Sequence, residues 1–291
     1  MSITATEFLS DHPDAITAEA EDRFFASLKT GNNTFKRTEV SRFAGIDERC
    51  IEIFGKAGGT LSEVLDIGVS SGVTTLELSE LLIRAGQDPL ITGTDLALTA
   101  YLLEVGPGLR VLVDEHGHAL QYEIFGRAVR AWVRRADYVT GMILLLGALR
   151  LLTRGKVRRL LRAENLHDHE LVLLSRRVRN NPRIAVESND ILQLTDSYIG
   201  RFDFVRAANI LNRGYFDEGE LRRAIGNVAR YLSGPGAWLL VARSVEQKTA
   251  GTLFRLAADG RRFKVSCRFG EGSEIESLVL GTVLPHGWGD K

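Results

Sequence analysis

The spacing of hydrophobic positions changes within residues 63–77, and this stretch predicts the centre of the fold. A short apolar run at 63–67 is followed by glycine and serine at 68–72, after which leucines recur from Leu76 to Leu82. The pattern predicts a strand, a tight turn and a helix in succession. A glycine turn at the start of a helix lets backbone N–H groups approach an electron-rich ligand closely.

The same alternation returns later in the chain. The further predicted elements are a second strand (89–95), a third strand (182–188), a fourth strand with its loop (201–216), a helix (218–232), a fifth strand (233–243) and a final hairpin (262–269 with 274–280). Together they predict an α/β fold with a Rossmann-like doubly wound sheet, mostly parallel with one antiparallel strand.

The chain between the second and third strands is longer than a crossover requires, since roughly 20 residues suffice. Residues 99–181 are therefore predicted to be an insertion. It begins with a β-hairpin at 109–125, whose turn contains His116 and His118. An H-x-H pair can bind a metal, but no cysteine or carboxylate-rich partner accompanies it, so a turn is favoured and no metal is expected.

Residues 1–60 show helical spacing and are expected to form a helical cover over the sheet, because exposed sheet faces need burying. The alternative is that they close over a ligand, with Arg37 in the segment to watch for lid behaviour. The expected organisation is thus a helical cover (1–60), a core (61–98 and 182–291) and an insertion (99–181).

The charge is distributed unevenly, although the 291-residue chain has a net charge of zero and a globular composition. Residues 127–162 contain ten arginines and lysines against one acid, Asp137, which gives +9 and leaves −9 for the rest. Such an asymmetry indicates a surface that meets phosphate groups of lipid or nucleic acid.

The basic segment has an amphipathic pattern. Residues 138–149 carry no charge, but twelve residues are too few to span a bilayer, and arginines then recur every four positions from Arg150 to Arg162. Such a helix can lie on an anionic membrane. The alternatives are a core-covering helix with a solvated arginine face or a homodimer interface. Nucleic acid is disfavoured because Trp132 and Tyr138 are the only aromatic residues in the segment.

Two distant cysteines, Cys50 and Cys267, suggest neither a disulfide framework nor a zinc site, and the N-terminal residues do not resemble a secretory signal. A cytoplasmic protein is therefore expected. If the basic helix meets lipid, the protein would be peripheral to the inner face of a membrane.

Two acidic residues next to predicted strand ends suggest a nucleotide-like cofactor. The turn has Gly68 and Gly72 but Ser70 where a pyrophosphate-binding fingerprint needs its middle glycine. Asp66 can instead meet the cationic amino-acid end of S-adenosylmethionine, directly or through water, and Asp95 can accept hydrogen bonds from both ribose hydroxyls. S-adenosylmethionine is thus favoured over NAD.

In these motifs the sequence resembles class I S-adenosylmethionine-dependent methyltransferases: the turn at 66–72, Thr94-Asp95, Asn189-Asp190 and the segment 202–209 stand where that family has its motifs. Ser70-Ser71-Gly72 and 202–212 are also similar to chemotaxis receptor methyltransferases, although Val73-Thr74-Thr75 replace the two glutamates and proline of that family. The residues that the resemblance implies for the cofactor are Asp66, Gly68, Ser70, Ser71, Gly72, Asp95, Leu96, Asn189, Asp190, Ile191, Ala207 and Asn209.

The acceptor is expected at the carboxyl ends of the strands, next to Asn212, Arg213, Tyr215 and Arg37. The expected activity is methyl transfer to a hydroxyl or carboxylate of a small-molecule, lipid-linked or saccharide acceptor, with no residue identified as the base. A non-catalytic S-adenosylmethionine-binding or membrane-peripheral protein is the alternative, and an NAD-dependent oxidoreductase is a third hypothesis.

Overall fold

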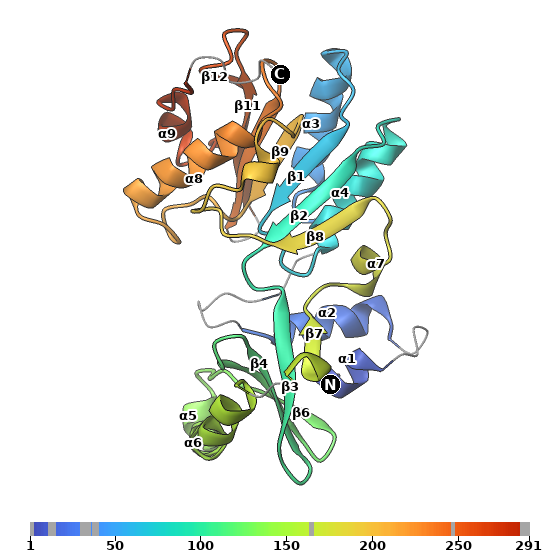
Figure 1. Cartoon of the computed structure of the whole chain (residues 1–291), viewed down its shortest axis with the longest axis vertical. Helices are drawn as coiled ribbons and strands as arrows, with labels where there is room; N and C mark the ends of the chain where they lie inside the picture. The colour runs from blue at the N-terminus through green and yellow to red at the C-terminus, as the bar shows by residue number, and fades with distance from the viewer. Residues whose placement is uncertain are drawn as a thin grey trace. The chain divides into compact units, whose positions relative to one another are not determined.

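The computed structural model describes residues 3–10, 16–29, 36, 41–162, 166–245 and 248–285. The chain forms two compact units (Figure 1). Unit 1 comprises Met1–Thr38 and Ala97–Ser175, and unit 2 comprises Glu39–Leu96 and Arg176–Lys291. The expected helical cover, 1–60, is therefore divided: its first part belongs with the insertion, and its last helix belongs with the sheet.

Unit 2 is built on a seven-stranded sheet in the order β12-β11-β10-β9-β1-β2-β8. The strands are β1 (Glu63–Ile67), β2 (Leu90–Asp95), β8 (Ile184–Ser188), β9 (Phe204–Ala208), β10 (Trp238–Val245), β11 (Lys248–Leu256) and β12 (Phe263–Phe269). Five neighbouring strands of this sheet, β8, β2, β1, β9 and β10, pair in parallel. The strand β11 is antiparallel to both of its neighbours, β10 and β12. The prediction of a mostly parallel sheet with one reversed strand is confirmed.

The final hairpin was placed wrongly by the sequence. Residues 274–280 contain a helix, α9 (Glu276–Leu280), because Ile275, Leu278 and Val279 bury one helical face in the core. The partner of β12 is β11 instead, a strand that was not predicted from the sequence. Gly251 interrupts the hydrophobic pattern of β11, and it is required there because a Cβ would lie 2.8 Å from the carbonyl oxygen of Val241 on β10.

Helices cover both faces of this sheet. One face carries α3 (Ala44–Lys56), α4 (Val73–Arg84) and α7 (Arg176–Arg179), and the other carries α8 (Glu218–Tyr231) and α9. A short 3-10 helix, η3 (Asp196–Tyr198), precedes β9. Because side chains alternate along a strand, Val64 of β1 packs towards α3 and α4, whereas Leu65 packs towards α8.

Unit 1 contains a five-stranded antiparallel sheet in the order β6-β5-β4-β3-β7. Its strands are β3 (Thr99–Gly106), β4 (Leu109–Asp114), β5 (Ala119–Ile124), β6 (Arg127–Arg130) and β7 (Glu170–Val172). Its helices are α1 (Ala5–Leu9), α2 (Ala18–Ser27), α5 (Asp137–Thr140), α6 (Met142–Leu160) and the 3-10 helix η2 (Leu166–His169). The helices α1 and α2 contribute to one hydrophobic cluster with the sheet, and α6 contributes to another.

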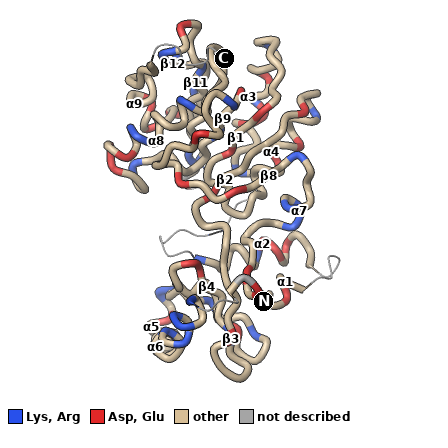
Figure 2. The backbone as a smooth tube through the Cα atoms, viewed as in Figure 1, with Lys and Arg blue, Asp and Glu red and all other residues tan. Residues whose placement is uncertain are grey.

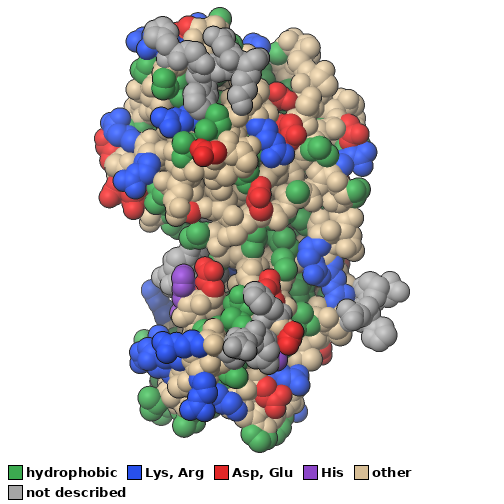
Figure 3. Space-filling view, in the orientation of Figure 1, with side chains coloured by type: hydrophobic (Ala, Val, Ile, Leu, Met, Phe, Trp, Pro, Cys, Tyr) green, Lys and Arg blue, Asp and Glu red, His purple; other side chains and the backbone are tan. Residues whose placement is uncertain are grey.

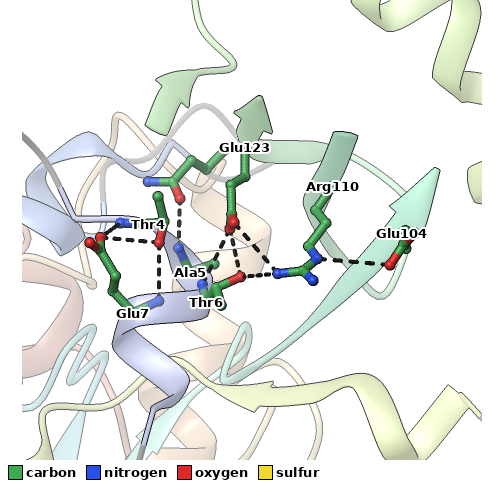
Figure 4. Close-up of polar contacts among 8 residues, drawn as sticks. Thr4, Ala5, Thr6, Glu7, Glu104, Arg110 and Glu123 are labelled. Atoms are coloured by element: carbon green, nitrogen blue, oxygen red, sulfur yellow. Dashed lines mark hydrogen bonds and ion pairs between the residues drawn. The ribbon is translucent and has the colours of Figure 1, made fainter. Parts of the chain in front are cut away.

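The N-terminal helix is fastened to the inserted strands (Figure 4). The backbone N–H of Ala5 donates to Oε1 of Gln121 at 2.9 Å, and Oγ1 of Thr6 donates to Oε2 of Glu123 at 2.7 Å. Arg110 donates to the Thr6 hydroxyl at 2.9 Å. These bonds explain why the first residues cover the inserted sheet rather than the parallel one. Arg37 lies outside the described residues.

We expect Phe24→Ala to destabilise unit 1 selectively. Phe24 is fully buried, stacks on Phe8 with ring centroids 4.4 Å apart and meets Phe25 edge-on. Its truncation should cost about 3–5 kcal/mol. Hydrogen exchange should show earlier opening of β3, β4 and β5 in denaturant, while β1 and β9 keep their protection. Equal loss of protection in both units would contradict the division.

Candidate functional site

The parallel strands of unit 2 end at a common edge, and the strand order reverses between β1 and β9. From β1 the chain continues to β2 and β8 on one side, whereas β10 follows β9 on the other. In doubly wound sheets, ligands bind in the crevice at the carboxyl ends of the strands where the order reverses. The loops that follow β1 and β9, residues 68–72 and 209–216, are therefore the first place to look for a ligand site.

The loop after β1 is a tight turn with three left-handed residues. Gly68, Ser70 and Gly72 have φ angles of 78°, 57° and 82°. The N–H groups of Gly68 and Val69 both donate to the carbonyl oxygen of Thr94, at 2.7 and 3.0 Å. The turn is thereby held against the end of β2. Gly72 caps α4, and its Cβ would lie 2.9 Å from Val178, so a larger residue does not fit.

Asp95 joins this turn to the end of β2. Its Oδ2 accepts a hydrogen bond of 2.7 Å from the N–H of Ser70, and its carbonyl oxygen accepts from the N–H of Asn189 at 3.2 Å. Leu96, the next residue, is exposed. The structure thus brings the glycine turn, Asp95 and Asn189 together from three neighbouring strands.

The residues after β8 mainly stabilise their own turn. The two carboxylate oxygens of Asp190 accept hydrogen bonds from the backbone of Leu192 and the side chain of Gln193, each at 3.0 Å. The Asn189 amide donates to the Thr195 hydroxyl at 2.7 Å. Ile191 is buried in the core. Of the residues expected on the adenine side, Asn189 stands nearest to Asp95 in the described contacts.

The loop after β9 contains both supporting and exposed residues. Ala207 is buried, and Oδ1 of Asn209 accepts from the N–H of Ser244 at 2.7 Å, which ties the ends of β9 and β10. The Asn212 side chain bonds to backbone groups of its own loop, so it shapes the loop rather than offering its amide to an acceptor. Arg213 and Tyr215 are exposed.

The two loops at the switch point approach each other. A Cβ on Gly68 would lie 3.2 Å from Cβ of Ile210, so the absence of a side chain at residue 68 leaves room for the loop after β9. Ser71 is buried beside the start of α4. The expected cofactor residues of the turn and of β9 therefore belong to one continuous part of unit 2.

Asp66 does not lie at this edge but in a buried ionic cluster beneath the turn. It is the register partner of Arg206 on β9. Nε and Nη2 of Arg206 donate to its two carboxylate oxygens at 2.9 and 2.6 Å, and the Thr75 hydroxyl of α4 donates at 2.6 Å. Asp66 was expected to meet the cationic end of a cofactor, directly or through water; in the structure its carboxylate is bonded to Arg206 and Thr75.

The same arginine also holds Asp47 of α3, with Nη1 donating to Oδ2 at 2.6 Å. Asp47 and Arg206 are almost fully buried, and Oδ1 of Asp47 has no hydrogen-bond partner among the described residues. Burial raises the pKa of Asp47 to about 6, since the lowering effect of Arg206 is opposed by the nearby Asp66. Burial alone would lower the pKa of Arg206, but the two carboxylates raise it above its usual value.

The cluster was missed at the sequence level, although one signal was present. Arg206 is the only charged residue of the strand segment Phe204–Ala208, and it stands between the core residues Val205 and Ala207. A charge at such a position requires a partner on a neighbouring element. One of the two partners, Asp66, was singled out in the sequence, although in another role. The other partner, Asp47, is separated from Arg206 by 159 residues and was not.

The hairpin histidines form a turn. The backbone N–H groups of His116 and His118 both donate to Oδ1 of Asp114, at 3.0 and 2.8 Å. Across the described ranges, no group of three or more His, Cys, Asp or Glu side chains is placed to hold a metal ion.

No protein-family model and no curated protein sequence matches the chain. Among solved structures, it is similar to the N-methyltransferase NodS from Bradyrhizobium japonicum in complex with S-adenosyl-L-homocysteine, at 17% identity and a TM-score of 0.32, over 69% of this chain and 61% of that one. It is similar to CalS10, an amino pentose methyltransferase from Micromonospora echinaspora, at 14% identity and a TM-score of 0.32, over 76% and 66%.

A third similar structure is an O-methyltransferase family protein from Burkholderia thailandensis, at 18% identity and a TM-score of 0.32, over 77% of this chain and 41% of that one. In all three cases the match covers less than two thirds of the other protein. At such low similarity, a functional conclusion has to come from the residues of this chain.

We expect Asp47 to make stability depend on pH. The folded protein raises the pKa of its carboxyl from the usual 3.8 to about 6, so the contribution of Asp47 to stability is greatest below pH 3.8 and is lost as the pH rises through about 6. Relative to Asp47→Asn, the wild type should therefore lose about 1–2 kcal/mol of unfolding free energy between about pH 4.5 and about pH 7. Urea unfolding of both proteins measures this difference; parallel pH profiles would contradict it.

Arg206→Met should destabilise unit 2 by about 3–5 kcal/mol, because two buried carboxylates then lose their shared cation. A triple variant, Asp47→Asn with Asp66→Asn and Arg206→Met, serves as the matched control. It should recover much of the lost stability, because no uncompensated charge is left. Urea unfolding followed by circular dichroism measures both differences. If Arg206→Met alone is as stable as the wild type, the role of Arg206 is contradicted.

Proposed function

We propose that unit 2 binds S-adenosylmethionine at the carboxyl edge of its sheet and that the chain is a methyltransferase. The observation that carries the proposal is the hydrogen bond between the N–H of Ser70 and Oδ2 of Asp95, 2.7 Å long, at the strand-order reversal. It joins the glycine turn to an acid at the tip of β2. These are two features that a nucleoside-containing ligand requires.

The residues present fit this cofactor better than a dinucleotide. A carboxylate at the end of β2 suits a ribose diol, and the positive φ angles of Gly68 and Gly72 give the loop after β1 the tight glycine turn that nucleotide folds use beside the ligand. Ser70 stands where a pyrophosphate turn needs a glycine. Asp95 would hold the ribose, the turn 68–72 the amino-acid portion, and Leu96 and Asn189 the adenine side.

When bound, the cofactor supplies a methyl group already activated on a sulfonium. The chain's own residues then have to orient the acceptor and exclude water. Arg213 and Tyr215 are exposed on the loop after β9, and they would contact the acceptor there. In its phenolate form, Tyr215 would accept the proton of a hydroxyl acceptor and become a phenol again, whereas a carboxylate acceptor needs no base.

The acceptor we propose is a hydroxyl or carboxylate of an amphiphilic molecule, which includes lipid-linked and saccharide compounds. This proposal is supported by Arg213 and Tyr215, an arginine and an aromatic residue that are both exposed on the loop after β9. The similarity to chemotaxis receptor methyltransferases stays a prediction from the motifs alone and carries no glutamyl specificity.

A second candidate function is non-catalytic binding of S-adenosylmethionine. It is favoured by the side chains of Asn209 and Asn212, which are bonded within unit 2 and so contribute less to an acceptor site. The two functions share cofactor binding and differ in turnover. Release of S-adenosylhomocysteine in the presence of acceptor extracts distinguishes them, because the non-catalytic protein produces none.

Asp95→Ala should weaken binding of S-adenosylhomocysteine at least tenfold, or about 1.4 kcal/mol, in calorimetric titration. The reason is the loss of the carboxylate that faces the turn. Asp88→Ala is the matched control: Asp88 precedes β2 at the opposite edge of the sheet and pairs with Arg183. Its removal should leave affinity unchanged.

Two outcomes would count against the proposal. If Asp95→Ala binds as tightly as the wild type, the carboxylate has no part in the site. If neither S-adenosylmethionine nor S-adenosylhomocysteine binds while NAD does, the turn is a dinucleotide site and the methyltransferase function is wrong.

A further inference from the structure

The helix α6 of unit 1 has a buried face and an outward apolar face. Its buried residues Leu146, Leu149, Thr153 and Val157 follow helical spacing, and the three hydrophobic ones pack against β3, β4 and β5. Leu144, Leu151 and Leu152 point away from that core and are 76–77% exposed. Leaving three leucines in water is unfavourable, so this face needs an explanation.

The outward apolar surface continues onto α5. Tyr138 and Val139 are 70% and 90% exposed, and Gly141, with a φ angle of 72°, turns the chain directly from α5 into α6. We define the α5–α6 face as these two residues with Leu144, Leu151 and Leu152. Its residues are large and apolar, and none of them belongs to a hydrophobic cluster of the described structure.

Basic residues surround this face. Figure 2 shows Lys and Arg gathered on α5 and α6, and Figure 3 shows them beside hydrophobic side chains on the same part of unit 1. Along α6, the outward stripe runs from Leu144 through Leu151 to Arg158, and Arg162 follows just after the end of the helix; all four residues are exposed. The single acid of residues 127–162, Asp137, is already paired with Arg130.

We propose that the α5–α6 face docks onto an anionic lipid surface, with its leucines entering the interface and its arginines at the headgroups. An apolar stripe flanked by cations is the arrangement that both parts of such a surface stabilise. Within the described residues, no helix is long and apolar enough to cross a membrane. The contact is therefore one that lies on the bilayer.

Two other occupants of the α5–α6 face, a second copy of this chain and a nucleic acid, are disfavoured by its charge and its exposed leucines. A second copy of this chain would bring together two copies of the segment 127–162, each with a net charge of +9, and like charges oppose such an interface. A nucleic acid would neutralise the arginines but leave the exposed leucines in contact with phosphate and water. An anionic membrane is complementary to the cations and also removes the leucines from water.

This inference does not depend on the cofactor, since α5 and α6 belong to unit 1 and the cofactor site to unit 2. If both proposals hold, docking brings the enzyme to the membrane surface, where amphiphilic acceptors are concentrated.

Vesicle flotation of the full chain tests the proposal. Vesicles with about 30% phosphatidylglycerol should bind the protein at about 50 mM salt, and binding should fall at least tenfold at about 500 mM salt or with pure phosphatidylcholine. The variant Leu144→Ser with Leu151→Ser and Leu152→Ser keeps every charge and should bind at least tenfold more weakly. Arg154→Gln with Arg158→Gln and Arg162→Gln keeps the leucines and should also lose at least tenfold.

A matched control removes three exposed charges from unit 2: Arg223→Gln with Arg262→Gln and Lys264→Gln. It has the same net charge as the arginine variant and should bind vesicles like the wild type. Circular dichroism confirms folding of each variant, and titration with S-adenosylhomocysteine on the same samples reports separately on the cofactor site. Loss of that binding with vesicle binding retained would refute only the proposed function.

Several outcomes would overturn the docking proposal. These are no vesicle binding at low salt, unchanged binding by the leucine variant, or equal losses in the arginine variant and its control. A dimer in sedimentation that the leucine variant abolishes would assign the face to a second copy. Binding to duplex DNA that is tighter than to vesicles and independent of the leucines would assign it to nucleic acid.

Discussion

The arrangement of unit 2 depends on the buried ion pair between Asp66 and Arg206. These residues are register partners on β1 and β9, the two strands between which the sheet reverses its order. Through Asp47 and Thr75, the pair also fixes α3 and the first turn of α4. The glycine turn begins two residues after Asp66, and the loop after β9 begins three residues after Arg206. The cluster, in which two carboxylates share one guanidinium, thus positions both loops of the candidate site from beneath.

The sequence predicted the parts of the fold that local patterns encode. The turn 68–72 and the acid at position 95 were found because glycine spacing and strand ends are visible in the sequence, and the structure brings them together. The parts that it missed depend on distant partners. Asp66 looked like a ligand-facing acid because its partner Arg206 lies 140 residues away. Residues 274–280 have a pattern compatible with a strand, and only their packing against α8 makes α9 helical. Residues 1–60 were expected to cover the parallel sheet, whereas α1 and α2 pack on the inserted one, because amphipathic spacing shows that a face is buried but does not identify its partner.

The two units differ in which of their surface groups are used for internal contacts. In unit 1, α1 and α2 join one hydrophobic cluster with the sheet and α6 joins another, so the outer side of α6 has no structural task within the cores described. The excess of positive charge lies in residues 127–162, the segment that contains α6, although the whole chain is neutral. In unit 2, the polar groups at the carboxyl edge are mostly engaged with one another, and this fixes the shape of the loops. This difference agrees with the two proposals, in which unit 2 binds a small molecule and unit 1 docks onto a lipid surface.

The most direct test of the cofactor site is hydrogen exchange with and without S-adenosylhomocysteine. The account predicts slower exchange at the backbone amides of 68–72, at Asp95 and Leu96, and at Asn189, with little change in unit 1. The Ser70 amide should be among the most strongly protected, because it already donates to Asp95 and would then be covered by the ligand. Protection confined to unit 1, or no protection by S-adenosylhomocysteine alongside protection of the same turn by NAD, would contradict it.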